Sequence, residues 1–298
     1  MITPEDSSPQ LVEVYRSLRL PDCEQQTLVL SAVGIHSMTV VRGGMFVVVV
    51  PEESAELALK HLREVAQEAT VPVAEPKAPK EHPRAWTGSI LYALIMMGVA
   101  YAAGRGWFGF DWLESGSLNG AIPSTHEWWR VVTALTLHAD VGHLISNLVF
   151  GVVLGYLASR SLGGGIAWAG ILVGAMMGNA LDALWMPEEQ RSIGASTAVF
   201  AALGVLSAYA WVLETASNLR WAKRLGPLIA GVMLLGFLGA GGERTDVVAH
   251  VTGFISGCAL GVILGKIPEQ RFDSRTLQLA AGAFTLIAVA VAWLFALR

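Results

Sequence analysis

Residues 253–265, GFISGCALGVILG, carry no charged side chain and place a glycine at every fourth position. Residues four apart lie on one face of a helix, so Gly253, Gly257, Gly261 and Gly265 form a ridge without side chains. Ridges of small residues let helices approach closely inside a membrane, where close packing rather than water exclusion holds helices together. The stretch therefore predicts a membrane helix that packs closely against a second helix.

The composition of the whole chain agrees with this. Of 298 residues, 53% are hydrophobic and only 15% are charged, which is typical of a membrane protein. The net charge of −4 gives no basic surface for DNA or RNA, so nucleic-acid binding is set aside. The two cysteines, Cys23 and Cys258, lie in a polar and an apolar part of the chain, which argues against a disulfide or a cysteine metal site.

Seven apolar runs from Trp86 onward are each long enough to cross a bilayer, which takes on the order of 20 residues per helix. The fold class expected is an all-α polytopic membrane protein. With the amino terminus inside, ten Lys and Arg residues flank the cytoplasmic ends and five the outer ends, so we expect the amino terminus in the cytoplasm and the carboxyl terminus outside, most simply in the cell membrane. The runs are 86–104, 143–159, 165–186, 194–214, 225–241, 246–266 and 276–297.

The first 85 residues have a different character. Residues 1–70 alternate between strand and helix patterns in the order β-α-β-β-α, which predicts a small α+β cytoplasmic domain resembling a domain of some signal-transducing proteins. Residues 71–85 contain four prolines and predict a flexible linker before the transmembrane domain, 86–298. Residues 105–142 are rich in tryptophan, which favours a membrane interface.

Polar groups inside membrane spans are costly and are functional candidates by default. In this layout His143 and Asn147 fall at the outer end of the second run, Ser196 at the outer end of the fourth and His250 near the outer end of the sixth. Four residues far apart in sequence therefore reach one membrane depth. The full set of polar candidates is His138, His143, Asn147, Asn179, Asp182, Ser196, Thr197 and His250.

These residue types suit nucleophilic catalysis. A serine hydroxyl becomes a nucleophile when a base accepts its proton, and a neutral histidine is the usual base, so Ser196 and His250 are a candidate pair. The oxyanion that follows needs hydrogen-bond donors, which the Ser196 amide and the side chains of His143 and Asn147 can supply. Gly194 lets the chain turn tightly into the helix of Ser196. The pair meets if the glycine ridge packs against the fourth run.

Four motifs resemble the rhomboid family. HADVGHLISN (138–147) is similar to its H-x-x-x-x-H-x-x-x-N pattern, GAST (194–197) to G-x-S-x, AHVTGFISG (249–257) to A-H-x-x-G-x-x-x-G, and EWWR (127–130) to the Trp-Arg signature of its first loop. The resemblance covers about residues 86–266 and implies a six-helix core with a seventh helix added.

Rhomboids are intramembrane serine proteases, so the resemblance implies a Ser196–His250 dyad that cuts transmembrane protein substrates in the bilayer. It also implies an oxyanion hole of His143, Asn147 and the Ser196 amide, an aromatic Phe200 packed on the histidine, supporting roles for Gly194, Gly253 and Gly257, and no metal or other cofactor. Thr197 departs from the family, because many members have glycine after the serine.

Other interpretations remain open. A transporter or channel can use the same residues, with His138, His143, Asn147 and His250 lining a proton or metal path, and an inactive rhomboid relative would only bind membrane proteins. His138 lacks the H-E-x-x-H context of a zinc protease and is interpreted as structural. Asp246, one turn before His250, is expected to cap a helix rather than complete a triad. Asn179 and Asp182 receive no role.

Overall fold

The computed structural model describes residues 10–70, 82–215, 221–239 and 246–298. Within it the chain separates into two compact units, Met1–Ala78 and Pro79–Arg298, each described here by itself. Of the expected linker 71–85, residues 71–81 lie outside the described ranges.

The first unit is a three-stranded antiparallel sheet covered by two helices, with the strand order β1-β3-β2. The turn between the second and third strands uses Gly43 and Gly44, whose φ angles of 57° and 79° are open to glycine without strain. Val48 and Val50 of the central strand are fully buried against Leu30 and Leu62 of the helices. The elements are β1 (Leu11–Ser17), α1 (Leu20–Ala32), β2 (Met38–Arg42), β3 (Met45–Pro51) and α2 (Ala55–Thr70).

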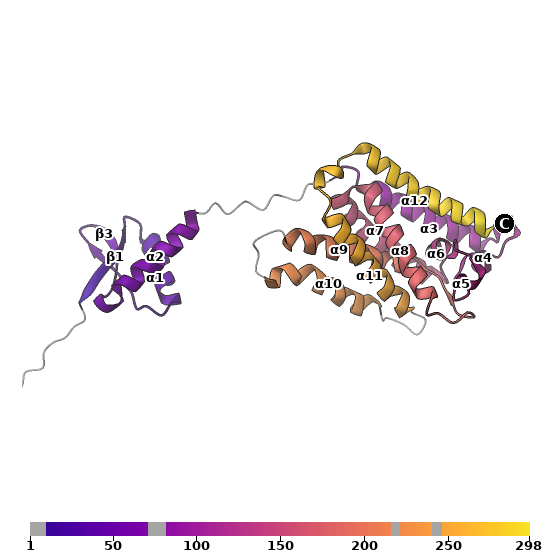
Figure 1. Cartoon of the computed structure of the whole chain (residues 1–298). Coiled ribbons are helices and arrows are strands. Elements are labelled where there is room, and N and C mark those ends of the chain that lie inside the picture. Colours follow the sequence, from indigo (N-terminus) through magenta and orange to yellow (C-terminus); the bar gives the residue numbers. More distant parts are fainter. Residues whose placement is uncertain (1–9, 71–81, 216–220, 240–245) are drawn as a thin grey trace, which may run out of the picture. The chain divides into compact units, whose positions relative to one another are not determined.

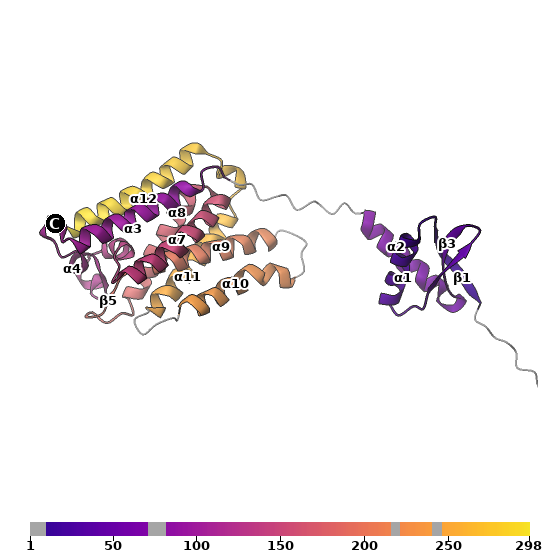
Figure 2. The same cartoon turned by 180° about the vertical axis from the view of Figure 1, so that it is seen from behind.

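The second unit is a bundle of long apolar helices (Figures 1 and 2). In the described part, six helices are long and apolar enough to cross a membrane, which confirms a polytopic helical protein. The run expected at 225–241 forms helix α10, whose apolar part, Leu225–Phe237, is shorter. The long helices are α3 (Trp86–Gly104), α7 (Val141–Leu162), α8 (Gly164–Ala183), α9 (Ser196–Thr215), α10 (Trp221–Gly239), α11 (Val247–Gly265) and α12 (Arg275–Ala296).

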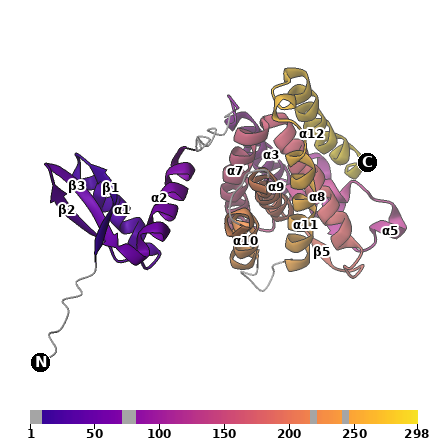
Figure 3. The same ribbon diagram turned by 60° about the vertical axis from the view of Figure 1, so that its left-hand side comes forward.

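Helix α9 is the central helix of this unit. It contacts α7, α8, α10 and α11, and Figure 3 shows it enclosed by its neighbours. Of its apolar segment, 61% is buried within the protein, against 11% for α12, which lies at the outside of the bundle. The serine at the start of α9 is therefore held by the most enclosed helix of the chain.

The segment between α3 and α7 is folded onto the bundle. It contains α4 (Trp112–Gly116), α5 (Ile122–Thr125), α6 (Arg130–Thr133) and strand β4 (Leu118–Asn119), which pairs with β5 (Arg191–Ser192). The buried guanidinium of Arg130 donates hydrogen bonds of 2.8 Å to the carboxylate of Glu127 and to the carbonyl oxygens of Glu114 and Ser117. A buried cation with three acceptors fixes the path of this loop.

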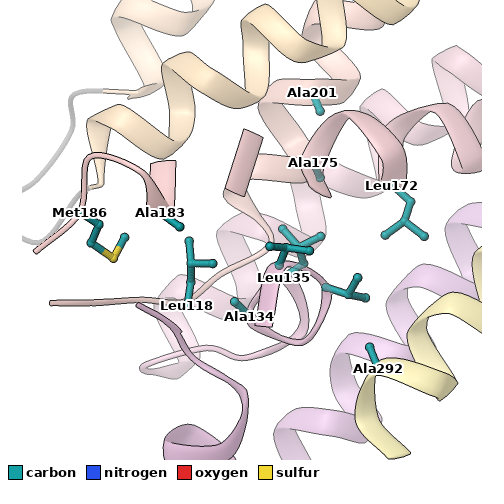
Figure 4. Packing of buried hydrophobic residues seen from close by; sticks show 11 residues of the cluster. Leu118, Ala134, Leu135, Leu172, Ala175, Ala183, Met186, Ala201 and Ala292 are labelled. Carbon is teal, nitrogen blue, oxygen red and sulfur yellow. The ribbon is translucent and has the colours of Figure 1, made fainter. Parts of the chain in front are cut away.

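A core cluster joins this loop to the helices. Leu118 and Leu135 of the loop pack with Leu172 and Ala175 of α8 and with Ala201 of α9 (Figure 4). The loop is thus an integral part of the bundle rather than a surface excursion, and it positions the start of α9.

Helix α12 is attached to the bundle at its two ends. Near its start, the side-chain oxygen of Gln278 accepts hydrogen bonds from the amides of Gly165 (2.8 Å) and Ile166 (3.1 Å), while its nitrogen donates to the carbonyl oxygens of Leu162 (2.8 Å) and Phe272 (2.9 Å). The first amides of a helix have no partner within that helix, so Gln278 caps α8 from a distant helix.

Candidate functional site

The site begins at the turn into α9. Gly194 has a φ of 132°, a conformation that other residues rarely adopt, and its amide donates a 2.9 Å hydrogen bond to the carbonyl oxygen of Ala134 in the first loop. A side-chain carbon built on Gly194 would lie 2.6 Å from both Cε1 and Nε2 of His143. The absence of a side chain is therefore what allows the His143 ring to lie against this turn.

Helix α7 brings the amide side chain to the same turn. Asp140 caps the helix by accepting a 2.8 Å bond from the amide of His143, and Asn147 lies one turn further, 5% exposed. The carbonyl oxygen of Asn147 accepts a 2.9 Å bond from the Tyr92 hydroxyl. Its Nδ2 is buried with no hydrogen-bond partner among the described residues and lies 3.5 Å from the position that a Cβ of Gly194 would occupy. An unused donor thus stands beside the start of α9.

Helix α11 supplies the histidine. Asp246 precedes the helix and accepts a 3.0 Å bond from the amide of Ala249, which confirms the expected capping role. His250 is 7% exposed, and its ring lies 4.4 Å from the ring of Phe200. Phe200 follows Ser196 by one turn on the same face of α9. Ser196 is half-buried. In the chain it lies between Gly194, which lies against His143, and Phe200, whose ring contacts His250.

The glycine ridge of α11 packs on α9. A Cβ added to Gly253, Gly257 or Gly261 would lie 2.6, 2.2 or 2.5 Å from the carbonyl oxygen of Thr197, Ala201 or Val205, respectively. These are backbone-to-backbone approaches that no larger residue permits. The helix that approaches the ridge is therefore the one that carries Ser196.

Thr197 occupies the junction of three helices. Its methyl carbon Cγ2 would lie 2.9 Å from a Cβ on either Gly178 of α8 or Gly253 of α11, and the residue is 3% exposed. The side chain after the serine is accommodated by glycines on both neighbouring helices. This explains in packing terms how the chain tolerates a threonine at this position.

The remaining polar candidates lie around this cluster. The His138 ring is 5.2 Å from the His143 ring, and burial together with the nearby His143 lowers the pKa of His138 to about 4, so the ring is neutral at pH 7. Asn179 donates a 3.0 Å bond to the carbonyl oxygen of Val131 and so ties α8 to α6. Asp182 is buried near the end of α8. A cavity of about 650 Å³, lined in part by Asp111, His138 and Asp140, borders the start of α7.

Sequence reasoning missed Gln278 and Trp293, both in the last apolar run. The indole of Trp293 donates a 3.1 Å bond to the Thr136 hydroxyl and lies 4.6 Å from the ring of Trp112. The signal available for Gln278 was its polarity inside an apolar run; nothing local indicated that three of its four partners lie more than a hundred residues earlier.

Together these contacts define a class: a multi-pass helical membrane protein in which His143 and Asn147 of one helix lie against the glycine turn that leads to Ser196, and His250 of a third helix contacts Phe200, one turn after that serine. Comparison with known proteins agrees. Residues 125–267 match the family model of the rhomboid domain, so this part of the chain is a rhomboid domain.

Three relatives show the extent of the similarity. Rhomboid-like protein 11, chloroplastic, of Arabidopsis thaliana is 30% identical over 164 residues, 49% of this chain and 56% of the relative. Rhomboid-like protease 3 of Toxoplasma gondii is 32% identical over 149 residues, 49% of this chain and 56% of the relative. Rhomboid protease GluP of Bacillus subtilis is 28% identical over 182 residues, 60% of this chain and 34% of the relative. The matched part of the chain spans little more than half the length of the first two of these relatives and about a third of the length of the last.

Proposed function

We propose that this chain is an intramembrane serine endopeptidase that hydrolyses peptide bonds in or near the transmembrane segments of other membrane proteins. Ser196 is the nucleophile and His250 the general base. The oxyanion of the tetrahedral intermediate is bound by the Ser196 amide and the side chains of His143 and Asn147. The reaction needs no metal or other cofactor.

The observation that carries this proposal is the buried, unpartnered Nδ2 of Asn147 beside the turn into α9. A buried polar atom without a partner costs free energy, and such atoms persist where function uses them. An unpaired amide donor beside the amino terminus of the helix that carries Ser196 can donate a hydrogen bond to the oxyanion that develops there. The His143 ring, held against the same turn, is the second side-chain donor.

The placement in the membrane is proposed from the lengths of the apolar runs and from the distribution of Lys and Arg at their ends. We propose seven spans, with α10 as the fifth, an amino terminus with its small domain in the cytoplasm, a carboxyl terminus outside, and residence in the cell membrane. In this arrangement Ser196 lies toward the outer side, as does the cavity lined in part by His138 and Asp140 at the start of α7.

Covalent labelling tests the dyad. A fluorophosphonate probe applied to the folded protein in detergent is expected to label Ser196, because only an activated serine hydroxyl attacks phosphorus at a useful rate. Ser196→Ala and His250→Ala are each expected to abolish labelling and cleavage of a transmembrane substrate. Ser192→Ala and His126→Ala are the matched controls, since Ser192 lies four residues before Ser196, His126 lies in the first loop, and both are outside the cluster. Undiminished labelling in His250→Ala would overturn the dyad and favour the transporter alternative.

Removal of the oxyanion donor separates its role from that of the base. Asn147→Ala is expected to lower kcat by on the order of a hundredfold or less, with a much smaller change in KM, because the Ser196 amide and His143 still donate. Asn147→Asp, which replaces a donor with an acceptor, should be worse. Activity of Asn147→Ala equal to that of the unaltered protein would remove Asn147 from the site.

A further inference from the structure

A second cavity, of about 440 Å³, lies on the side of the bundle where α3 and α12 run past each other (Figures 1 and 2) and reaches the residues on either side of Ser196. Its walls come from α3, α8 and α12, and it is closed at one end by the first loop and by Ala195 and Ala198 of α9. All three wall helices are candidate membrane spans, so the cavity lies within the bilayer rather than in water.

The lining offers almost nothing to a polar ligand. The Tyr92 hydroxyl is bonded to Asn147, the Thr136 hydroxyl to Thr133 and Trp293, and the Gln278 amide to four backbone groups. The Thr285 hydroxyl is bonded to the carbonyl oxygen of Ala281, and Thr87 is exposed at the start of α3. The buried exception is Nε1 of Trp168, which has no hydrogen-bond partner among the described residues. It lies against Gly88, where an added Cβ would be 2.1 Å away, and both residues line one end of the cavity. A buried indole N–H normally has an acceptor.

The dimensions select the occupant. Along α12 the lining runs from Gln278 to Val289, about 16 Å at 1.5 Å per residue. One leaflet of the hydrocarbon core is about 15 Å thick. A volume of about 440 Å³ spread over this length is too narrow for a transmembrane helix, which is about 10 Å wide, but it is wide enough for a single hydrocarbon chain. Apolar cavities of this kind do not hold water.

We propose that this cavity binds one acyl chain of a membrane lipid, from the leaflet on the side where α3, α8 and α12 begin. On binding, a shift of the Trp168 ring exposes Nε1, which is enclosed in the empty cavity, so that it donates a hydrogen bond to the ester carbonyl of the chain, while the methyl end reaches Ala195 and Ala198. These two alanines flank Ser196 in the chain, so the lipid supports the back of the turn that carries the serine. The binding itself is independent of any catalytic activity.

Photocrosslinking tests the proposal on the full chain in phosphatidylcholine nanodiscs. A trace of phosphatidylcholine with a diazirine along one acyl chain is expected to label residues 279–289 of α12 and 164–172 of α8. Gly282→Leu should reduce this labelling at least fivefold, because Gly282 lines the cavity and an added Cβ meets nothing closer than 3.7 Å. Ala280→Leu, exposed on the same helix and outside the lining, is the matched control. Ala283→Leu, also in the lining, is the second variant if Gly282→Leu does not fold.

Two results would overturn the proposal. One is labelling that survives unchanged in both Gly282→Leu and Ala283→Leu. The other is labelling no stronger in the cavity than at Leu277 and Leu294, which are exposed outside it. Trp168→Phe tests the placement of the ester: it should weaken labelling by the phosphatidylcholine probe but not by a diazirine alkane without an ester. Equal effects on both probes would place the ester elsewhere. Because none of these measurements needs proteolysis, their failure is distinct from failure of the proposed enzymatic function.

Discussion

Helices α11 and α12 are both apolar, similar in length and adjacent in sequence, yet they are attached to the bundle by opposite means. Helix α11 lies against α9 along its whole length, with glycine backbone against carbonyl oxygens. Helix α12 packs on α8 and α6 through side chains, forms polar bonds at Gln278 near its start and Trp293 near its end, and borders the 440 Å³ cavity between them. Backbone contact along the glycine ridge leaves no space between α11 and α9, whereas the packing of α12 leaves a cavity beside it.

The two kinds of attachment should respond very differently to one added methyl group. Gly257→Ala places a Cβ 2.2 Å from the Ala201 carbonyl oxygen, so we expect a loss of about 3 kcal/mol in the free energy of unfolding, at the upper end for overpacking because backbone must move. Gly282→Ala on α12 meets nothing closer than 3.7 Å and should be neutral or slightly stabilising. Unfolding of both variants in increasing SDS measures the difference, and similar losses would erase the contrast between the helices.

Loss of the first anchor of α12 is the next largest effect. Gln278→Leu keeps the size of the side chain but leaves the amides of Gly165 and Ile166 without acceptors, so we expect a loss of about 2 kcal/mol. Thr276→Val, an exposed change on the same turn, controls for the start of the helix. If Gln278→Leu unfolds at the same SDS concentration as the control, the anchor contributes nothing.

The second anchor is a single hydrogen bond and should be weaker. Trp293→Phe removes the donor to Thr136 while keeping an aromatic ring beside Trp112, and we expect a loss of about 1 kcal/mol. Thr136→Val removes the acceptor. In a double-mutant cycle the two losses should not add, because both variants break the same bond; full additivity would show that the bond is not formed.

The smallest expected effect concerns α4, the loop element that supports Trp293. The bond from Arg191 holds the pKa of the Glu114 carboxyl below its usual value, although the pair is exposed. Because the pKa of Glu114 is lower in the folded state, its contribution to stability is fully present above the usual glutamate pKa of about 4.3. The contribution is lost as the pH falls below that value and through the lowered folded-state pKa. The Tm of Glu114→Gln should lie slightly below that of the unaltered protein at pH 7 and equal it near pH 3. A difference that persists at pH 3 would contradict this origin.

Local patterns predicted much of this chain, and distant contacts account for what they missed. Most apolar runs begin and end within about three residues of the helices in the structure, because hydrophobic length and charged flanks are properties of contiguous sequence. The exception is the run at 225–241, whose helix begins four residues earlier and whose last two residues lie outside the described ranges. The ridge from Gly253 to Gly265 indicated a close helix partner but not which one, since any helix can approach a bare face. Gln278 escaped notice because a lone polar residue near the end of a run resembles an interface residue, and its four partners are set by tertiary structure.

The candidate site shows the same division. The motif spacing placed His143 and Asn147 on one face of a helix, and a helical repeat is enough for that inference. That the Asn147 donor faces the Gly194 turn, and that Thr197 fits between Gly178 and Gly253, depends on how three helices cross, which no short stretch encodes. The catalytic roles of Ser196 and His250 stay predictions for labelling and kinetics to decide.

The bond from Gln278 to the start of α8 has a consequence for biosynthesis. The ribosome delivers residues 165 and 166 to the membrane more than a hundred residues before their acceptor is made. Until α12 inserts, the backbone amides of Gly165 and Ile166 must hydrogen-bond to water or to lipid headgroups. We therefore expect the start of α8 to remain hydrated while translation continues. Insertion of α12 then replaces these partners with Gln278 and completes the packing of a helix that entered the membrane much earlier.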